Sequence, residues 1–357
     1  MDAIRQFVEP RVATPLVSTS PAKETRVATR LGLETVARFA DHPSGYLVMN
    51  REMFHFTSAD VEGFIAYRPF GSVLFQFGGV FAAPEDQVRL LQQFQSLARR
   101  MGKHICAVQL RPEDVAVYQR AGFCINQFGN SYTLDLAGFK TSGTPFMKMR
   151  NKISRARKSG ITVRELGVDA PRTPESWSAL QSITAAWLPT KGRHAKLLEF
   201  LVGELGDAEN TSRRAFVAYH EGNPVAFITY VPAYGRYAGL MHDISRRAPA
   251  APPGVMELIN VTAIERFKKE GLGYLNFGLT PFFGLSPETD RVPGRNKGVS
   301  WLLGLLAKYG SAIYPAETQV QYKLKWHPDT IVPEYVAFEG RFRWSMAWRL
   351  LLVTRSI

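Results

Sequence analysis

The sequence predicts an α/β protein built as two tandem units, each with a mixed sheet flanked by helices. Three observations lead to this fold class. Short runs of branched and aromatic residues alternate with segments whose apolar residues recur at helical spacing. The same order of strands and helices starts again after a basic junction near the middle of the chain. The 357 residues, 45% of them hydrophobic, are also enough for two cores.

The first predicted unit, residues 31–139, follows an N-terminal leader, residues 1–30. It opens with three short strands, GYLVMN, FIAYRP and VLFQFGGV. A helix over 84–103 comes next, because its apolar residues recur at every third position. A buried strand (HICAVQL), a short helix (PEDVAVYQRAGF) and a last strand (INQFGNSYTLDL) complete the unit.

The second predicted unit, residues 166–340, repeats this order with different residues. It starts with a helix (WSALQSITAAWL), a hairpin that turns at Gly222 and Asn223, and a strand (RYAGLMHDI). A helix (GVMELINVTAIERFKKEG), a strand (LGYLNFGL) and a further helix (GVSWLLGLLAKYG) follow. We therefore expect two similar α/β units in tandem.

The junction, residues 140–165, is predicted to be a basic connecting helix. Between Lys140 and Arg164 it contains no acidic residue. Basic residues at this density favour contact with phosphates, and a merely solvated helix face is the alternative. The candidate phosphate-binding residues are Lys148, Arg150, Lys152, Arg155, Arg157 and Lys158.

Composition narrows the classes of partner and cofactor. The net charge of +13, from 44 basic and 31 acidic residues, favours a polyanionic partner. No secretory signal is recognisable and no apolar run is long enough to span a bilayer, so we expect a cytoplasmic protein, with peripheral membrane contact left open. Cys106 and Cys124 form no CxxC pattern and the seven histidines show no ligand spacing, so we expect no metal and no cofactor.

The stretch MHDISRRAPAAPPGVMELIN, residues 241–260, carries the candidate site. Asp243 and Arg246 stand where a strand runs out into a Pro-rich turn, and a bend is needed to bring both side chains to one mouth. Glu257 lies in the first turn of the next helix and shares a face with Asn260. We predict that Asp243 and Arg246 are catalytic and that Glu257 and Asn260 bind substrate. The alternatives are a structural salt bridge and a carboxylate that stabilises the helix start.

Lys323 and Lys325 in YKLKWHP alternate with apolar residues. This spacing predicts a strand with both lysines on one side and Tyr322 and Leu324 on the other. Such a pair suits an anionic substrate group, although lysines also protect exposed edge strands.

The C-terminal segment, residues 341–357, is predicted to be a basic aromatic helix. It combines four arginines with Phe342, Trp344 and Trp348. Such a helix either lies on an anionic membrane or packs on its own domain, and the sequence leaves both open.

Several of these motifs resemble known proteins. VYQRAGF, residues 117–123, resembles the helix-to-strand ending of the GCN5-related N-acetyltransferase (GNAT) fold. HDISRRAPAAPPGVMELINV, LNFGLTPFFGLS and YKLKWHPDTIVPEYVAF, together with the basic junction, resemble the catalytic region of lysylphosphatidylglycerol synthases, which are tandem-GNAT aminoacyltransferases. The resemblance spans roughly residues 40–340 and implies two tandem GNAT-like domains.

The resemblance also implies a donor and site roles. The donor would be an aminoacyl-tRNA, held by the basic junction, rather than acyl-CoA. FAAPEDQ, where acyl-CoA enzymes have a Gly-rich loop, lacks glycines and carries two acids. Asp243 and Arg246 match the family's acid and arginine, with Asp243 as a base or as the group that binds the donor ammonium, and Arg246 binding a phosphate or the developing oxyanion.

The acceptor is the least defined part. We expect no membrane flippase segment, and the stretch after Trp187 lacks the small residues expected of phospholipid-specific members. These departures slightly favour a soluble hydroxyl or amine acceptor of a natural-product pathway over a phospholipid headgroup such as phosphatidylglycerol. The sequence is also compatible with an acyl-CoA-dependent N-acyltransferase and with a non-catalytic module that binds tRNA or membranes.

Overall fold

A computed structural model describes residues 33–191, 200–285, 292, 295–309, 316–340, 342 and 344–354. The strands are β1 (Phe54–Phe56), β2 (Gly63–Phe70), β3 (Val73–Ala82), β4 (His104–Leu110), β5 (Phe123–Asp135), β6 (Thr162–Glu165), β7 (Arg214–His220), β8 (Asn223–Ala233), β9 (Gly239–Arg247), β10 (Tyr274–Pro281) and β11 (Thr330–Glu339). The α-helices are α2 (Gln87–Arg100), α3 (Val115–Arg120), α4 (Met147–Lys158), α5 (Pro174–Trp187), α6 (Val255–Lys269), α7 (Lys297–Tyr309), α8 (Ala316–Leu324) and α9 (Trp344–Val353). Short 3₁₀ helices are η1 (Gly45–Met49), η2 (Pro112–Asp114), η3 (Thr144–Phe146), η4 (Leu188–Lys191) and η5 (Gly235–Tyr237).

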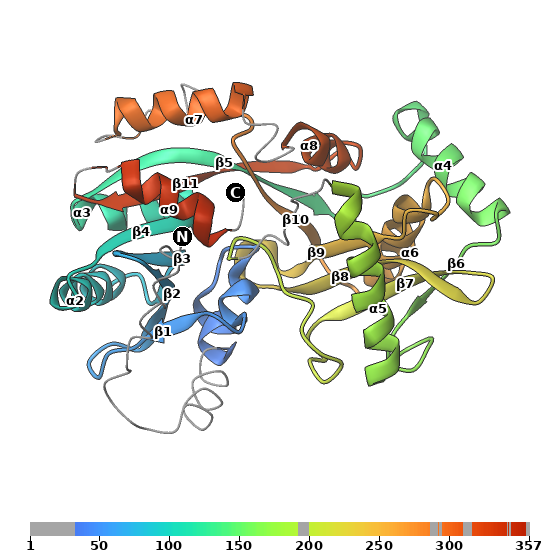
Figure 1. The fold of residues 1–357 in the computed structure, drawn as a ribbon, viewed down its shortest axis with the longest axis horizontal. Coiled ribbons are helices and arrows are strands. Elements are labelled where there is room, and N and C mark those ends of the chain that lie inside the picture. Colours follow the sequence, from blue (N-terminus) through green and yellow to red (C-terminus); the bar gives the residue numbers. More distant parts are fainter. Residues whose placement is uncertain are drawn as a thin grey trace, which may run out of the picture.

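The described strands form one continuous mixed sheet, in the order β1-β2-β3-β4-β11-β5-β10-β9-β8-β7-β6. The β3–β4 and β9–β10 pairs are parallel and the other pairs are antiparallel. The predicted α/β class with mixed pairing is thus confirmed. The two predicted units meet where β5 pairs with β10, and β11, from the second unit, lies between β4 and β5 of the first (Figure 1). The exact domain boundaries stay a prediction.

Helices cover both faces of each half of the sheet. In β7 the buried residues alternate: Phe216 and Ala218 pack with α4 and α6, whereas Ala215 and Val217 pack with α5. In the other half, neighbouring residues of β3 face opposite sides: Phe75 packs in the core under α7 and α9, whereas Leu74 packs in the core under α2. Figure 1 shows these helices on either side of the long sheet.

The strand predicted for GYLVMN is wrong. Residues 45–49 of this run form the 3₁₀ helix η1, in which the backbone N–H of Leu47 bonds the carbonyl of Ser44 at 2.9 Å. Residues 45–48 are all buried, so this run is apolar because it is enclosed on every side rather than because it lies in a sheet. A short apolar run is ambiguous between such structures.

Strands β9 and β10 separate near the centre of the sheet, and this separation positions the candidate site. Their parallel pairing covers only residues 239–241 of β9, whereas the pairing of β9 with β8 continues to Arg247. In β10 the register shifts between Asn276 and Leu279, and Gly278 there has a φ of +65°, in the left-handed region that favours glycine. Residues 242–247 of β9 therefore have no β10 partner beside them.

Candidate functional site

A cavity of about 590 Å³ lies where β9 and β10 separate. We call it the β9–β10 cavity. Its lining includes Leu47 and Leu201, which pack with the α7 and α9 core, as well as Phe277 and Tyr322, which pack with the α4 and α6 core. The cavity is thus bounded from both faces of the sheet. It brings together half of the predicted site residues: Lys152, Asp243, Arg246, Glu257, Lys323 and Lys325.

A β-bulge places Asp243 and Arg246 on the same cavity. Residues three apart on a regular strand point to opposite faces. Against β8, however, the register moves from Ile228 opposite Ser245 to Tyr230 opposite His242, so β9 has an extra residue at this point. The bulge lies between His242 and Ser245, within β9. The two side chains are therefore brought together inside the strand, and not by a bend where the strand runs out into the Pro-rich turn.

The carboxylate of Asp243 contacts the guanidinium of Arg213, and both side chains are buried, with 3% and 1% exposed. Burial lowers the pKa of Arg213 to about 10, so this group is a cation at neutral pH. A Cβ at Gly203 would lie 2.0 Å from an oxygen of Asp243, so only glycine leaves room for the carboxylate there. Sequence reasoning missed Arg213, and its one signal is the Arg213-Arg214 pair at the start of β7.

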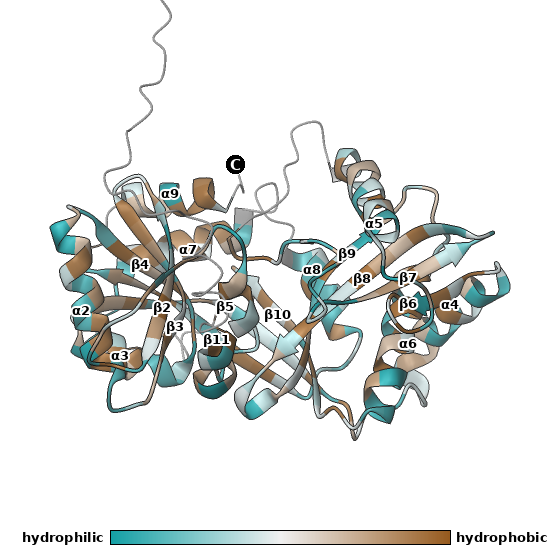
Figure 2. Ribbon diagram, turned by 90° about the horizontal axis from the view of Figure 1, so that it is seen from below, coloured by the Kyte–Doolittle hydropathy of each residue, from teal (hydrophilic) through white to brown (hydrophobic). Residues whose placement is uncertain are grey.

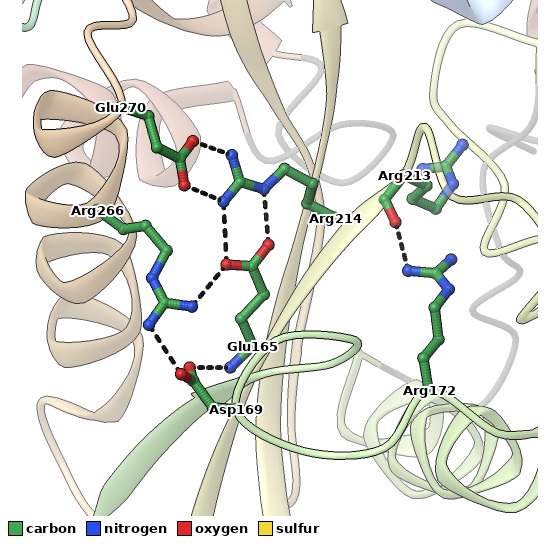
Figure 3. A network of polar contacts seen from close by, with 7 residues as sticks. All are labelled: Glu165, Asp169, Arg172, Arg213, Arg214, Arg266 and Glu270. Carbon is green, nitrogen blue, oxygen red and sulfur yellow. Dashed lines mark hydrogen bonds and ion pairs between the residues drawn. The ribbon is translucent and has the colours of Figure 1, made fainter.

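The other arginine of that pair fixes the start of β7. Arg214 bonds Glu165 at 2.6 and 2.9 Å and Glu270 at 2.5 and 2.8 Å, and Arg266 also bonds Glu165 (Figure 3). Because neighbouring residues of an extended chain point to opposite sides, this anchoring of Arg214 directs Arg213 toward Asp243. The backbone carbonyl of Arg213 also accepts a 2.8 Å bond from Arg172 (Figure 3).

Arg246 has a different environment. Its guanidinium lies 3.9 Å from the centroid of the Trp187 ring and donates to the Ser245 carbonyl at 2.8 Å. Its Nε has no hydrogen-bond partner, and no ion pair links Arg246 to a carboxylate among the described residues. Burial lowers its pKa to about 10. At neutral pH this wall of the cavity therefore presents a partly buried cation that could bind an anion.

Glu257 lies in the first turn of α6, as predicted, and is buried. Lys325 Nζ bonds its Oε1 at 2.8 Å, and Lys152 Nζ from α4 lies 3.7 Å from the same oxygen. Burial is the largest influence and would raise the pKa of Glu257, but the Lys325 hydrogen bond, the charges of Lys325 and Lys152 and a backbone hydrogen bond together lower it. Gly254 permits this arrangement, because a Cβ there would lie 2.2 Å from the Lys152 carbonyl.

Asn260 does not line the cavity. It is fully buried within the α6 core, where its Oδ1 accepts a 2.6 Å bond from the Tyr230 hydroxyl. The structure therefore gives Asn260 a packing role beside the site, although it shares the predicted helix with Glu257.

The strand predicted for Lys323 and Lys325 is wrong. Lys323 lies in helix α8, and Lys325 directly follows that helix. The two lysines therefore do not share a strand face: Lys323 Nζ donates to the carbonyls of Gly278 and Leu279 at 2.8 and 2.9 Å, whereas Lys325 reaches Glu257. The preceding residues AETQVQ form the first part of α8, and Val320, one turn before Lys323, is buried in the core. The helix therefore extends through YKL, and the short alternating pattern does not form a strand.

Buried Lys323 should make stability depend on pH. Burial lowers its pKa from 10.5 to about 7. Between these values the unfolded chain carries a proton that the folded chain loses, so the free energy of unfolding rises with pH across this window. We expect wild type to gain stability relative to Lys323→Met between pH 7 and 10, as measured by urea unfolding of both proteins at several pH values. A constant difference between the two would contradict the lowered pKa.

His242 is a poor base. It lines the cavity, but burial lowers its pKa to about 3, so the imidazole is neutral and binds a proton weakly. Among the described residues no group of three or more His, Cys, Asp or Glu side chains could hold a metal ion.

The basic junction contains α4, whose buried residues are Met149, Ile153 and Ala156. Arg150 donates to the carbonyls of Thr141 and Gly143 at 2.7 and 2.6 Å, so it also holds the preceding loop. Only Lys152 of the predicted tRNA-binding residues lines the cavity. The others are exposed on α4: Lys148, Arg150, Arg155, Arg157 and Lys158.

Known proteins resemble this chain in sequence and in fold. The family model described as phosphatidylglycerol lysyltransferase, C-terminal, matches residues 33–338. The lysylphosphatidylglycerol biosynthesis bifunctional protein LysX of Rhodococcus opacus is 23% identical over 303 residues, and that of Gordonia bronchialis 25% over 313 residues. These matches cover 84% and 85% of this chain, but the chain spans only 26% of each relative.

Two solved structures share the fold. L-PGS from Bacillus licheniformis superposes with a TM-score of 0.72 at 21% identity, covering 94% of this chain and 97% of that one. The C-terminal domain of a proposed lysylphosphatidylglycerol synthetase from Agrobacterium fabrum gives 0.74 at 20% identity, with 93% and 96% covered. The tandem GNAT-like architecture expected from the sequence is confirmed.

Proposed function

Because the chain belongs to the family of phosphatidylglycerol lysyltransferase C-terminal regions, we propose that it transfers an aminoacyl group from aminoacyl-tRNA to a phospholipid headgroup. The observation that carries the proposal is the β9–β10 cavity, which combines a buried carboxylate, a partly buried arginine whose Nε has no hydrogen-bond partner, and the edge of a basic helix. A site that only bound tRNA or a membrane would not need Asp243 and Arg246 at the wall of one cavity.

The acceptor differs from the one that the sequence slightly favoured. The family description names phosphatidylglycerol, and the LysX relatives are named for lysylphosphatidylglycerol. These names support a phospholipid better than a soluble amine or hydroxyl of a natural-product pathway. Arg246 provides the matching chemistry, because a guanidinium with a free N–H can bind the phosphate of a headgroup.

The transfer needs only groups that this cavity holds. The acceptor hydroxyl oxygen attacks the ester carbonyl, the bond from that carbon to the tRNA ribose oxygen breaks, and the hydroxyl proton ends on the ribose oxygen. Asp243 would accept this proton in transit or hold the donor ammonium. Arg246 would stabilise the developing oxyanion or orient the headgroup phosphate. Glu257, between Lys152 and Lys325, would bind the ammonium if Asp243 acts as the base.

A transfer assay tests the proposal. Purified protein is incubated with radiolabelled aminoacyl-tRNA and either dispersed phosphatidylglycerol or a mixture of small amines and hydroxylamines, with the set of amino acids varied. Label should enter the lipid, and RNase pretreatment should abolish transfer. Label in the small amines alone would restore the soluble acceptor, and turnover of acetyl-CoA that survives RNase would refute an aminoacyl-tRNA donor.

Exposed basic residues of α4 should govern the salt dependence of tRNA binding. Each phosphate contact contributes a slope of about −0.7 to −0.9 to the plot of log affinity against log salt. Replacing Lys148, Arg155 and Arg157 by Gln should therefore flatten the slope by about two units, while transfer at saturating tRNA persists. Filter binding across a salt series measures the slope. An unchanged slope would mean that this face of α4 is only solvated.

A further inference from the structure

Three tryptophans on two neighbouring helices are exposed. The exposed fractions are 62% for Trp301 on α7 and 58% for both Trp344 and Trp348 on α9. The chain's other tryptophans, at 177, 187 and 326, are buried or partly buried. We call Trp301, Trp344 and Trp348 the tryptophan face.

Both helices pack against the core through the sides opposite to the tryptophans. Val299 and Leu303 of α7, together with Met346 and Leu350 of α9, are buried in one core cluster. Of the two alternatives left open for the C-terminal helix, packing on the protein's own core is present, with the first half of the sheet as the partner, and it leaves the tryptophans outside. Because both helices pack on the same face of the sheet, their outer sides point away from that face. In Figure 2, α9 carries both hydrophilic and hydrophobic segments.

The charged residues of α7 and α9 are all basic. Lys297, Trp301, Gly304 and Lys308 follow one another at spacings of three and four on the exposed side of α7. Neither α7 nor α9 contains an acidic residue. Tryptophan bordered by lysine is typical of helices that lie in the interface of anionic membranes. A protein partner would be expected to present acidic side chains here, and a second copy of this basic chain would repel it.

From these contacts we propose that the tryptophan face docks the protein onto an anionic lipid bilayer, with α7 and α9 lying in the headgroup layer. Among the described residues no helix has the length and apolar character to cross a bilayer, so this contact is peripheral. Leu47 and Leu201 of the β9–β10 cavity belong to the same core cluster as α7 and α9, whereas α4 packs on the opposite face. Docking would thus turn one side of the cavity to the lipid and leave the basic helix free for tRNA. The purpose of the docking rests on the proposed function, but the binding itself does not.

Vesicle flotation tests the docking. Full-length protein is mixed with vesicles of phosphatidylcholine, with or without about 30 mol% phosphatidylglycerol. Wild type should float with the anionic vesicles. The Trp301→Ser, Trp344→Ser, Trp348→Ser triple variant should lose at least about tenfold in partitioning, since each tryptophan that enters the bilayer removes apolar area from water. Phe54→Ser, which removes an exposed aromatic residue on β1, is the matched control and should float as wild type does.

A fluorescence measurement covers the case of a poorly folded variant. Brominated phosphatidylglycerol should quench part of the wild-type tryptophan fluorescence. Absence of wild-type flotation, equal flotation of the triple variant, or conversion of a wild-type dimer into a monomer by the substitutions would overturn the docking. Transfer to short-chain, water-dispersed phosphatidylglycerol separates the two proposals: the triple variant should retain it and lose transfer to vesicles. Wild type that binds vesicles but transfers to neither acceptor would refute the proposed function alone.

Discussion

Replacing Asp243 by Asn is expected to lower aminoacyl transfer per folded molecule by about a hundredfold or more, the scale of a lost acid-base or charge-stabilising group. The same substitution should lower the free energy of unfolding by about 3 kcal/mol or more, because it leaves the buried Arg213 guanidinium without its carboxylate. Both effects follow from one contact. Turnover must therefore be normalised to the folded fraction, which circular dichroism at the assay temperature gives.

A double variant separates stability from chemistry. Asp243→Leu with Arg213→Met replaces the ion pair by apolar side chains, which should restore much of the lost stability but none of the turnover. The kinetic constants then assign the role: a lost ammonium contact raises the KM for aminoacyl-tRNA, whereas a lost base lowers kcat alone. Normal turnover of folded Asp243→Asn would show that the pair is only a structural salt bridge.

Replacing Arg246 by Met should have the opposite balance. We expect turnover to fall by about a hundredfold or more, because the Arg246 guanidinium is a partly buried cation in the cavity wall whose Nε has no hydrogen-bond partner. Stability should stay the same or rise, since Arg246 forms no carboxylate pair among the described residues and its burial as a cation is unfavourable. Arg246→Lys should restore little activity, because lysine cannot reproduce the planar stack on Trp187.

The control is another arginine that stacks on an aromatic ring. Arg38 lies 4.7 Å from the centroid of the Phe39 ring on an exposed part of the first half. Arg38→Met should leave turnover unchanged. A loss of stability in Arg246→Met that accounts for all of its lost activity would contradict a role for this residue in transfer.

The alternation of strand and helix patterns predicted the fold class and most elements, because periodicity reports which side of an element is buried. The hairpin at Gly222 and Asn223, helix α6 with Glu257 in its first turn and the basic helix α4 are all in place. Short segments were less reliable. GYLVMN and YKLK are compatible with several structures, and their conformation depends on what encloses them.

The sequence by itself determined the residue types of the site and the order in which they occur. It located Asp243, Arg246, Glu257, Lys323 and Lys325, all of which line the β9–β10 cavity. Tertiary structure decided how these side chains are paired. The bulge in β9, the 30-residue separation of Arg213 from Asp243 and the insertion of β11 between β4 and β5 depend on strand register and on contacts between distant segments. Local patterns carry no information on such contacts, because many cations could pair with a buried carboxylate equally well. Only the folded sheet determines which of them lies beside it.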